Sequence, residues 1–405
     1  MAAVFPCILS LNVGSSSIRF AVYDADAGLV RRLDGMLDRI GTRDATLTIN
    51  DPAAPSHSRS IVAAGDHGAA RRVLLEWLDA QPRLTALAAA GHRVVHGMHR
   101  VEPELVTPGL LTELRRLAPY APDHLPEAIA MIEALAERHP RLPQVACFDT
   151  AFHRTMPPVA TRLAIPRRFD AAGVQRYGFH GLSCAFLMAE LARLGDPAAT
   201  TGRVVLAHLG NGASMTAVRD GRSIDTSMGF TPAAGLPMST RSGDLDPGLV
   251  DYLARADGMT AAAFHRMATH ESGLLGVSET SADMRDLLAA EGDDVRAAEA
   301  VALFCYHARK WIGAFAAALG GVDTLVFAGG IGEHAPSVRR RICDGLGFLG
   351  IELDEALNAA AAGVVSTDTS RATVRIIPTD EALMIARSVV ASGCMTTSGR
   401  ESRYP

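Results

Sequence analysis

The chain has 405 residues, 48% of them hydrophobic and 20% charged, with a formal net charge of −5 at pH 7. This length exceeds what one hydrophobic core usually holds, so two domains are expected, and the apolar content excludes global disorder. No overall basic excess is present, so nucleic acid is not an expected partner. The most apolar stretches, residues 4–11 and 311–331, are typical of a strand and of a helix–turn–strand unit, so no membrane association is expected.

The cysteines are scattered along the chain and form no CxxC pair; they are Cys7, Cys147, Cys184, Cys305, Cys343 and Cys394. This spacing predicts neither a zinc ribbon nor a redox motif. Several cysteines lie in apolar runs and are expected to be buried free thiols. Free thiols fit a reducing compartment, so we expect a cytoplasmic protein.

The first half of the chain is expected to begin with three strands, the first two joined by a Gly/Ser loop. Alternation and turn residues place these strands at residues 4–11, 17–23 and 29–38. Polar, proline-rich sequence at residues 41–65 is expected to run over the surface without regular structure. Apolar periodicity then predicts helices at residues 69–80 and 127–138 and strands at residues 93–96 and 145–148.

The second half repeats this order. Strands are predicted at residues 203–209, 213–219 and 222–226, with a glycine loop after the first and a type I′ hairpin at Asp220-Gly221 after the second. Further helices are predicted at residues 246–255, 282–290 and 295–319, and two more begin near residues 336 and 379. Further strands are predicted at residues 324–328 and 373–377. The repeat predicts an α/β fold of two duplicated βββαβαβα-type domains, with mixed sheets around a nucleotide cleft.

Two glycine loops are candidate phosphate sites. Residues 12–17 and residues 208–214 each place backbone N–H groups at a tight turn between strands, and such groups favour an anion. An ordinary hairpin would also use Gly and Ser, and it is the better reading of either loop alone. Because the loops fall at equivalent places in the two halves, phosphate binding is the favoured interpretation of the pair.

A loop at residues 231–248 is rich in proline and glycine and lacks periodicity. Long structureless loops inside compact domains are uncommon and are often functional. Arg241 in this loop is a candidate cation for a phosphoryl group, because the guanidinium fork matches phosphate geometry. An ordinary surface arginine is the alternative interpretation.

Five other charged or polar residues are candidates, each with a structural alternative. Arg93 begins an apolar run and could stabilise a sheet edge, and Asp149 follows a strand where an acid can cap a turn. His180 has aromatic neighbours that fit a core histidine equally well. Asp283 stands three residues after a threonine, the spacing of a capping box. Glu381 lies in the first turn of the last helix, where the helix dipole alone favours an acid.

Taken in order, these motifs resemble the acetate kinase family over nearly the whole chain. The matching segments are residues 12–17, 93–97, 148–157, 177–183, 208–214, 225–246, 272–278, 329–333 and 377–387. The resemblance implies the duplicated-domain class that also contains sugar kinases, actin and chaperone ATPases, and it implies a homodimer. It further implies a first domain of residues 1–150 plus 379–405 and a second domain of residues 151–378.

The resemblance also implies roles for particular residues. Arg93 and Arg241 would bind the acetate carboxylate and then the phosphoryl group in flight. His180 would donate a hydrogen bond to the phosphoryl oxygens, and Asp149 would hold Arg93 or the reacting groups in place. A carboxylate is already a deprotonated nucleophile, so catalysis would come from alignment and charge neutralisation rather than from a general base.

The implied binding residues form three sets. Those for the acid are Arg93, Val95, His124, Phe179 and Pro232. Those for the nucleotide are Ser15, Ser17, Arg19, His208, Leu209, Gly210, Asn211, Gly212, Asp283, Met284, Arg285, Gly330, Ile331 and His334. The implied metal ligands, Asn12 and Glu381, would orient Mg²⁺, with Mn²⁺ as an expected substitute and ATP as co-substrate.

The implied reaction is reversible in-line transfer of the γ-phosphoryl group of ATP to acetate, giving acetyl phosphate and ADP. Propionate kinase, or a broader short-chain acyl kinase, is the alternative within this chemistry. A non-catalytic nucleotide-binding protein is the alternative of another class, disfavoured because competent residue types fill every implied catalytic position. An NAD-dependent dehydrogenase is weaker, because residues 329–332 match the dinucleotide fingerprint poorly.

The sequence departs from the family pattern in the residues around both substrates. Arg19 stands where lysine is usual, Met284 where an aromatic residue is frequent and His334 where asparagine is usual. These changes leave base and ribose recognition open. The family usually has a leucine in the acyl pocket. The residue at that position in this chain is Asp123 when the alignment is counted back from Asp149, or Tyr120 when it is counted forward. The preference among acids therefore stays open.

Overall fold

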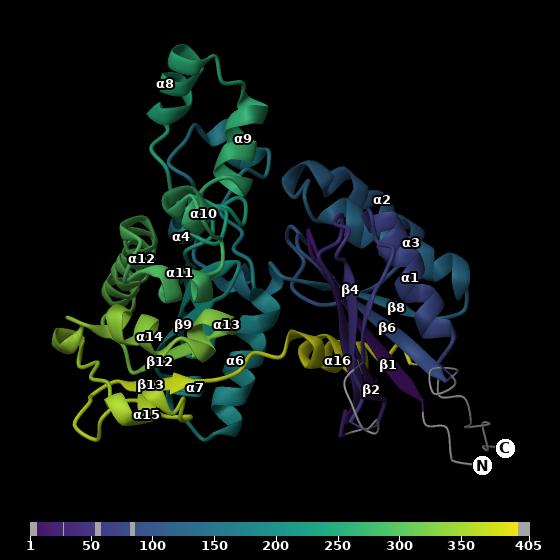
Figure 1. Ribbon diagram of the computed structural model, residues 1–405. Coiled ribbons are helices and arrows are strands. Elements are labelled where there is room, and N and C mark those ends of the chain that lie inside the picture. Colours follow the sequence, from purple (N-terminus) through teal and green to yellow (C-terminus); the bar gives the residue numbers. More distant parts are fainter. Residues whose placement is uncertain (1–5, 27, 53–57, 82–85, 396–405) are drawn as a thin grey trace. The chain divides into compact units, whose positions relative to one another are not determined.

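The computed structural model describes residues 6–26, 28–52, 58–81 and 86–395 (Figure 1). The chain divides into two compact units: unit 1 contains the described residues up to Ala151 and those from Asp380, and unit 2 contains Phe152–Thr379. Among the described residues, no helix has the length and apolar character needed to span a membrane.

Unit 1 is built on an eight-stranded mixed sheet with the order β5-β4-β3-β2-β1-β6-β8-β7. The central strand β1 (Cys7–Val13) pairs antiparallel with β2 (Ile18–Asp24) and parallel with β6 (Leu87–Val94). Strand β6 in turn pairs parallel with β8 (Gln144–Phe148). The strands β1, β6 and β8 therefore end at one common edge of the sheet.

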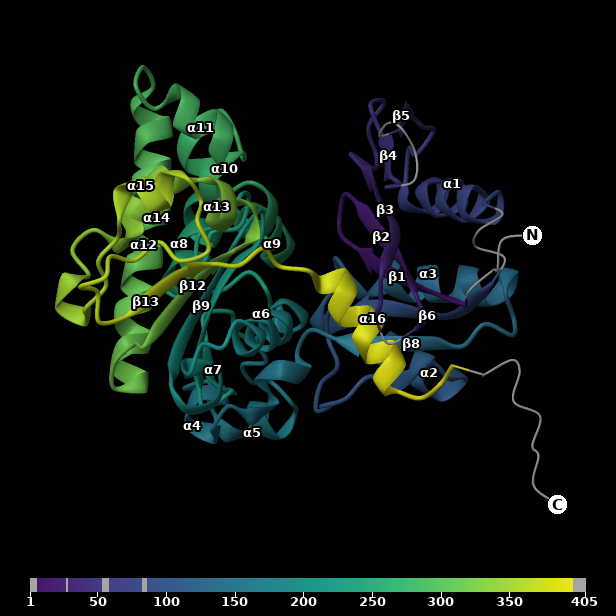
Figure 2. The ribbon, with the colours of Figure 1, turned by 90° about the horizontal axis from the view of Figure 1, so that it is seen from below.

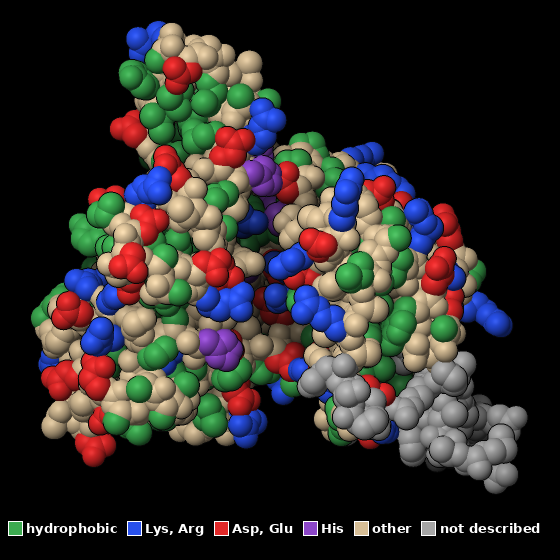
Figure 3. All heavy atoms as spheres, in the orientation of Figure 1, with side chains coloured by type: hydrophobic (Ala, Val, Ile, Leu, Met, Phe, Trp, Pro, Cys, Tyr) green, Lys and Arg blue, Asp and Glu red, His purple; other side chains and the backbone are tan. Residues whose placement is uncertain are grey.

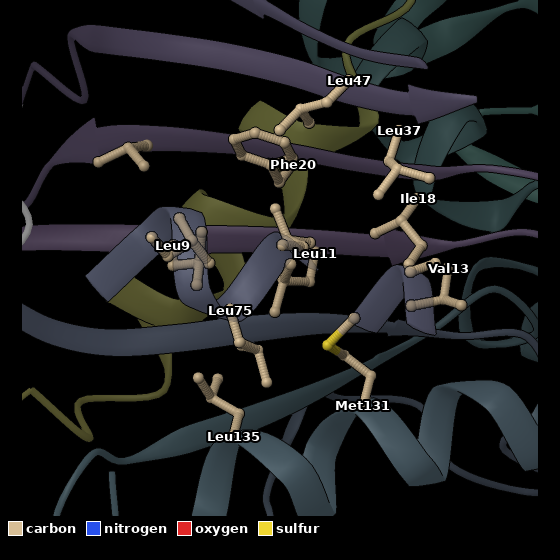
Figure 4. Close-up of a cluster of buried hydrophobic side chains, with 14 of the residues drawn as sticks. Leu9, Leu11, Val13, Ile18, Phe20, Leu37, Leu47, Leu75, Met131 and Leu135 are labelled. Atoms are coloured by element: carbon tan, nitrogen blue, oxygen red, sulfur yellow. The ribbon is translucent and has the colours of Figure 1, made fainter. Parts of the chain in front are cut away.

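Helices cover both faces of this sheet (Figure 2). One face packs against α1 (His67–Asp79) and α3 (Leu125–Arg138), and its core contains Leu9, Leu11 and Val13 of β1 (Figure 4). Alternate residues of the strands point to the other face, where α16 (Glu381–Ala391) lies against β1 and β6. The alternation of β1 thus directs Asn12 away from this core.

Unit 2 contains a five-stranded sheet with the order β11-β10-β9-β12-β13. Its strands are β9 (Arg203–Leu209), β10 (Ala213–Arg219), β11 (Arg222–Thr226), β12 (Thr324–Ala328) and β13 (Thr373–Ile376). Three antiparallel strands followed by two parallel ones repeat the arrangement β3-β2-β1-β6-β8 of unit 1. This shared order is the expected duplication.

Helices α12 (Val295–Leu319) and α6 (Gly181–Arg193) flank the sheet of unit 2 (Figure 2). Asp220 and Gly221 both have positive φ, 51° and 74°, as the predicted type I′ hairpin requires. The other helices of the chain are α2 (Pro108–Leu117), α4 (Pro158–Thr161), α5 (Arg167–Ala171), α7 (Ala198–Thr201), α8 (Gly248–Asp257), α9 (Ala261–His270), α10 (Gly273–Ser278), α11 (Met284–Ala290), α13 (Gly329–His334), α14 (Pro336–Cys343) and α15 (Glu355–Ala359), with short 3₁₀ turns at Ala118–Tyr120, Ala151–Thr155 and Gly347–Leu349.

Three sequence expectations need correction in unit 1. The segment expected to lack structure contains β4 (Thr46–Asn50) and β5 (Ser58–Ile61), which extend the sheet beyond β3 (Arg31–Asp38). The strand expected at residues 93–96 runs earlier, as β6, and helix α2 and the two-residue strand β7 (Glu104–Leu105) were not predicted. The expected start of β1 at Val4 lies outside the described residues.

Gly91 of β6 offers a test of how closely α16 packs against β6. A Cβ atom at Gly91 would lie 2.7 Å from Val389 and closer still to Ile385, both on α16. Gly91→Ala should therefore lower the free energy of unfolding by about 1–3 kcal/mol, the usual effect of overpacking. Chemical denaturation measures this value.

The matched control is Gly313→Ala on α12, where nothing lies within 4 Å of the added Cβ. Alanine favours a helix over glycine, so this variant should gain up to about 1 kcal/mol. Equal effects of the two substitutions would contradict the close packing of α16.

Candidate active site

Four polar side chains of unit 1 meet where the parallel strands end. Asn12 lies near the end of β1, Arg93 near the end of β6, Asp149 directly after β8 and Glu381 at the start of α16. Strand ends at one edge of an α/β sheet commonly form ligand sites. The amide of Asn12 donates to Glu381 Oε2 at 2.9 Å, and Arg93 donates to Asn12 Oδ1 at 3.1 Å. Three predicted catalytic or metal residues are thus brought together around Arg93.

Arg93 and Asp149 form the buried ion pair of this group. Nε and Nη2 of Arg93 both donate to Asp149 Oδ2, at 2.9 and 2.5 Å, and the two side chains are 14% and 0% exposed. Burial alone would disfavour the charge of Arg93, but Asp149 and Glu381 outweigh it and raise the pKa of Arg93 above its ordinary value. Arg93 is therefore a permanent, oriented cation.

Asn12 and Glu381 were predicted to hold Mg²⁺, and their chemistry fits that ion. Mg²⁺ prefers oxygen ligands and is commonly bound by one or two carboxylates together with waters and substrate phosphates. Glu381 supplies a carboxylate, and the amide oxygen of Asn12 keeps a second lone pair beside its bond from Arg93. No group of three His, Cys, Asp or Glu that could hold a metal ion occurs among the described residues. The donor set thus suits a cation that is also bound by the nucleotide.

The Gly/Ser loop of unit 1 joins β1 to β2 beside Asn12. Gly14 donates its backbone N–H to Ser17 O at 2.8 Å, which closes the turn. His67, at the start of α1, lies with Nε2 2.8 Å from Ser15 O. Ser15 and Arg19 are exposed and Ser17 is half-buried, so the predicted phosphate-binding hydroxyls remain accessible within unit 1.

His180, His208 and Arg241 gather around the equivalent glycine loop of unit 2. The rings of His180 and His208 stack with centroids 4.3 Å apart. A Cβ atom at Gly212 would lie 3.2 Å from His180 Nε2 and 3.9 Å from Arg241 Nη1. Glycine at position 212 therefore keeps a side chain away from two predicted catalytic groups.

His153, which sequence reasoning did not single out, supports the backbone at His180. Its Nε2 donates to Phe179 O at 2.8 Å, and its Nδ1 lies 3.0 Å from Ser223 Oγ. Burial lowers the pKa of His153 to about 4, so the ring is neutral at physiological pH. His180 itself has a left-handed backbone with φ 57° at the start of α6, a conformation that this bond helps to hold. No periodicity in the sequence distinguishes His153 from a core residue.

The two predicted nucleotide segments of unit 2 lie side by side. A Cβ atom at Gly329 would meet Leu209 O at 2.7 Å, and one at Gly210 would lie 3.8 Å from Gly330 N. Within α13, Glu333 accepts the backbone N–H of Gly329 at 2.8 Å. The β9 loop and the start of α13 are therefore packed directly against each other.

Arg241 comes from the long loop, which has no helix or strand between β11 and α8. Its Nη1 donates to Pro232 O at 3.2 Å, and Ser239 donates its N–H to Asn211 O at 3.2 Å. The loop is thereby tied both to the predicted acid-binding Pro232 and to the glycine loop that carries Asn211.

The residues predicted for adenosine lie partly at the surface. Asp283 caps α11 by accepting the N–H of Arg285 at 2.9 Å, and the two side chains form an ion pair. The side chains of Arg285 and His334 are 88% and 80% exposed, whereas Met284 is buried. Asp283 thus caps the helix as its N-cap residue, and not as the third residue of a capping box that begins at Thr280.

The predicted acid-binding residues belong to both units. In unit 1, Val95 is buried and His124 is half-buried at the N-cap of α3. Asp123 is also half-buried, but the cap position that we expected for it is held by His124. In unit 2, Phe179 is buried and its carbonyl is bonded to His153.

The repeated α/β units, with glycine hairpins at equivalent strand ends, define the class of duplicated-domain phosphotransferases. The model of the Acetokinase family matches residues 7–387, and the chain belongs to that family. An acetate kinase of Rhodopseudomonas palustris is 46% identical over 388 residues, covering 94% of this chain and 97% of the relative. A propionate kinase of Citrobacter rodentium is 40% identical over 390 residues, covering 95% and 96%.

Solved structures agree with this assignment. The acetate kinase of Porphyromonas gingivalis has a TM-score of 0.85 at 34% identity, covering 95% of this chain and 99% of that one. A propionate kinase from Francisella tularensis has a TM-score of 0.88 at 34% identity with the same coverage. The similarity therefore spans both units but includes enzymes named for two different acids.

The buried ion pair of unit 1 can be tested by removing one charge. Asp149→Asn preserves the shape of the side chain but leaves Arg93 without its closest counter-charge. Breaking a buried pair costs about 3–5 kcal/mol, and Glu381 compensates in part, so we expect a loss near 3 kcal/mol by chemical denaturation.

The matched control is Asp79→Asn, which removes the partner of Arg138 in a pair with side chains about one-third exposed. Exposed pairs contribute about 0–1 kcal/mol, so this variant should be nearly as stable as the parent. Similar losses of unfolding free energy in both variants would show that burial does not increase the contribution of the Arg93–Asp149 pair to stability.

Proposed function

We propose that the protein is an acetate kinase that transfers the γ-phosphoryl group of ATP to acetate, reversibly, giving acetyl phosphate and ADP. The observation that carries this proposal is the oriented cation Arg93, held by Asp149 beside Asn12 and Glu381 at the strand ends of unit 1. A buried arginine with a planar fork suits a carboxylate and a phosphoryl group alike. The full-length similarity to acetate kinases supports the same reaction.

The chemistry needs little covalent help from the protein. A carboxylate oxygen of acetate forms a bond to the γ-phosphorus, while the bond from that phosphorus to the bridging oxygen of ADP breaks. The electron pair of the broken bond stays on ADP, and no proton has to be removed from the nucleophile. Rate enhancement then comes from alignment and from stabilising charge on the transferring group.

Each proposed residue contributes to binding or to charge. Arg93 binds the acid carboxylate, Arg241 and His180 contact the transferring phosphoryl oxygens, and Asp149 keeps Arg93 oriented. His208 and Asn211 contact the phosphate tail. Mg²⁺, held through Asn12 and Glu381, would neutralise phosphate charge when bound.

Two other functions remain as alternatives. Propionate kinase is favoured by one specific observation, the 40% identity to a propionate kinase. An acetate kinase is more similar in sequence, at 46% identity, and acetate is therefore the acid that we propose. A non-catalytic nucleotide-binding protein would have to retain Arg93, Asp149, His180 and Arg241 without using them.

We also propose that the protein works as a homodimer. Helix α8 has no buried residue, although Leu249, Val250 and Tyr252 are on it. Val250 and Tyr252 are exposed, as is the preceding Leu245. Hydrophobic side chains gather over the part of unit 2 that α8 and α9 form (Figure 3). Apolar surface of this kind commonly marks an interface.

A cytoplasmic location is the proposal for the compartment. All six cysteines are free thiols, and all but Cys394 are buried. Free thiols persist in reducing compartments. ATP and short-chain acids are the expected small-molecule partners there.

The activity itself gives the direct test. The purified protein with ATP, Mg²⁺ and acetate should form acetyl phosphate, which hydroxylamine traps as a hydroxamate. Arg241→Ala is the matched control and should lose about 10²–10³ in kcat, as when one preorganised oxyanion donor is removed. A folded protein that binds ATP but yields no hydroxamate with any short acid would support the non-catalytic alternative.

Acid preference is tested at Asp123. Asp123 is half-buried and not fully enclosed, so we expect its carboxylate not to repel the substrate. Asp123→Leu should then leave acetate the best substrate, with propionate slower. The measurement is kcat/KM for acetate, propionate and butyrate in both proteins, beside a melting curve for each. A marked gain for the longer acids without loss of stability would instead assign Asp123 to the acyl pocket.

A further inference from the structure

The ring of His180 is bonded on its rear nitrogen to a serine. Nδ1 of His180 lies 2.9 Å from Oγ of Ser214, a residue near the start of β10. Both side chains are buried, with residue exposures of 9% for His180 and 1% for Ser214. Ser214 is paired across the sheet with His208, whose ring stacks on that of His180. The contact therefore lies behind the predicted catalytic face of the ring.

The direction of this hydrogen bond follows from the serine. A hydroxyl carries one proton to donate, and a buried donor without an acceptor is costly. Within the described chain, the side-chain hydroxyl of Ser214 has one recorded partner, His180 Nδ1. If Nδ1 carried the proton, both groups would offer a donor to each other, and the serine proton would be left without this acceptor. The favourable arrangement has Ser214 donating to an unprotonated Nδ1.

The same arrangement is fixed independently at another histidine of unit 2. His153 Nε2 lies 2.8 Å from the carbonyl oxygen of Phe179, which can only accept, so that nitrogen carries the proton. Because burial keeps this ring neutral, its Nδ1 is unprotonated and must accept from Ser223 Oγ at 3.0 Å. A serine donating to Nδ1 thus already sets one tautomer in this unit.

We propose that Ser214 is a positioning residue that holds His180 as the tautomer with its proton on Nε2. This inference rests on the proposed function, because it assigns to Nε2–H the task of donating to the transferring phosphoryl group. Nε2 lies beside Gly212, where an added Cβ atom would be 3.2 Å from it and 3.9 Å from Arg241 Nη1. A neutral ring that donates from Nε2 supplies a hydrogen bond there without adding a second full positive charge beside the guanidinium.

Ser183 contacts His208 as Ser214 contacts His180, so the two pairs can be compared. Its Oγ lies 2.8 Å from His208 Nδ1 and 2.7 Å from Thr379 Oγ1, so this hydroxyl has two alternative directions. Thr379 is half-buried and is not confined as Ser214 is. The tautomer of His208 is therefore not fixed by the same argument, although the two serines are chemically matched.

The first measurement is spectroscopic and does not need activity. Protein labelled with ¹⁵N-histidine should give two-bond imidazole correlations for His180 with protonated Nε2 and unprotonated Nδ1, assigned by their loss in His180→Gln. Ser214→Ala should move the Nδ1 signal, whereas Ser183→Ala should change His208 and leave the tautomer of His180 intact. A parent spectrum with the proton on Nδ1 would overturn the inference, even if the protein made no acetyl phosphate.

The second measurement separates positioning from folding. Ser214→Ala should lower kcat about tenfold, the lower end of the loss seen when a metal-bound histidine loses its hydrogen-bond partner, while KM for ATP changes less than twofold. Ser214→Thr retains a hydroxyl and should recover most of kcat. An unchanged kcat in a folded Ser214→Ala protein would reject the role, as would failure of Ser214→Thr to recover activity while its spectrum matches that of the parent.

Discussion

The buried ion pair between Arg93 and Asp149 is the interaction on which the candidate site of unit 1 depends. Asp149 and Glu381 outweigh the burial of a guanidinium that is 14% exposed and hold the pKa of Arg93 above its ordinary value. The same contacts fix its direction, since two of its nitrogens bind one carboxylate oxygen and a third reaches Asn12. Sheet topology supplies the geometry, because three parallel strands end where these residues stand.

The duplication gives the sheet of unit 2 an equivalent edge, but different residues lie at that edge. In place of a buried ion pair, the end of β9 carries a glycine hairpin with stacked imidazoles behind it. The start of α13 lies next to that hairpin because β12 pairs parallel with β9. A repeated fold thus offers one edge suited to a cation and a carboxylate, and another suited to phosphate oxygens.

Much of this architecture could be predicted because the strands alternate clearly and their turns use distinctive residues. The bounds of β9, β10, β11 and β12 follow directly from β-branched runs flanked by glycine. The strands β4 and β5 escaped prediction because polar, proline-containing sequence favours a loop, and only pairing with β3 stabilises them. Helix α2 was missed although Thr107 and Pro108 form a readable start signal.

Asp149 could be placed after a strand from the sequence, whereas Arg93 was expected at the start of a strand and lies near the end of β6. The residues that contact His180 and Phe179 could not be predicted, because a buried serine or histidine looks in sequence like any other core position. Ser214 and His153 are of this kind: only the distances to His180 Nδ1 and Phe179 O distinguish them. Sequence reveals which groups react more readily than what orients them.

Arg241 raises a different question, since a preorganised cation is carried by a loop without regular structure. The loop is held by its own backbone: Met238 donates to Arg241 O at 2.9 Å, and Leu274 donates to Met238 O at 2.8 Å. Gly243 has φ 73°, and a Cβ there would lie 2.7 Å from the carbonyl carbon of Leu236, so the chain folds back where only glycine fits. With its backbone groups satisfied in this way, the loop can present a guanidinium at a fixed place. Charge that develops in a transition state is best stabilised by groups that do not have to move, so a loop held in this way suits the role that we propose for Arg241.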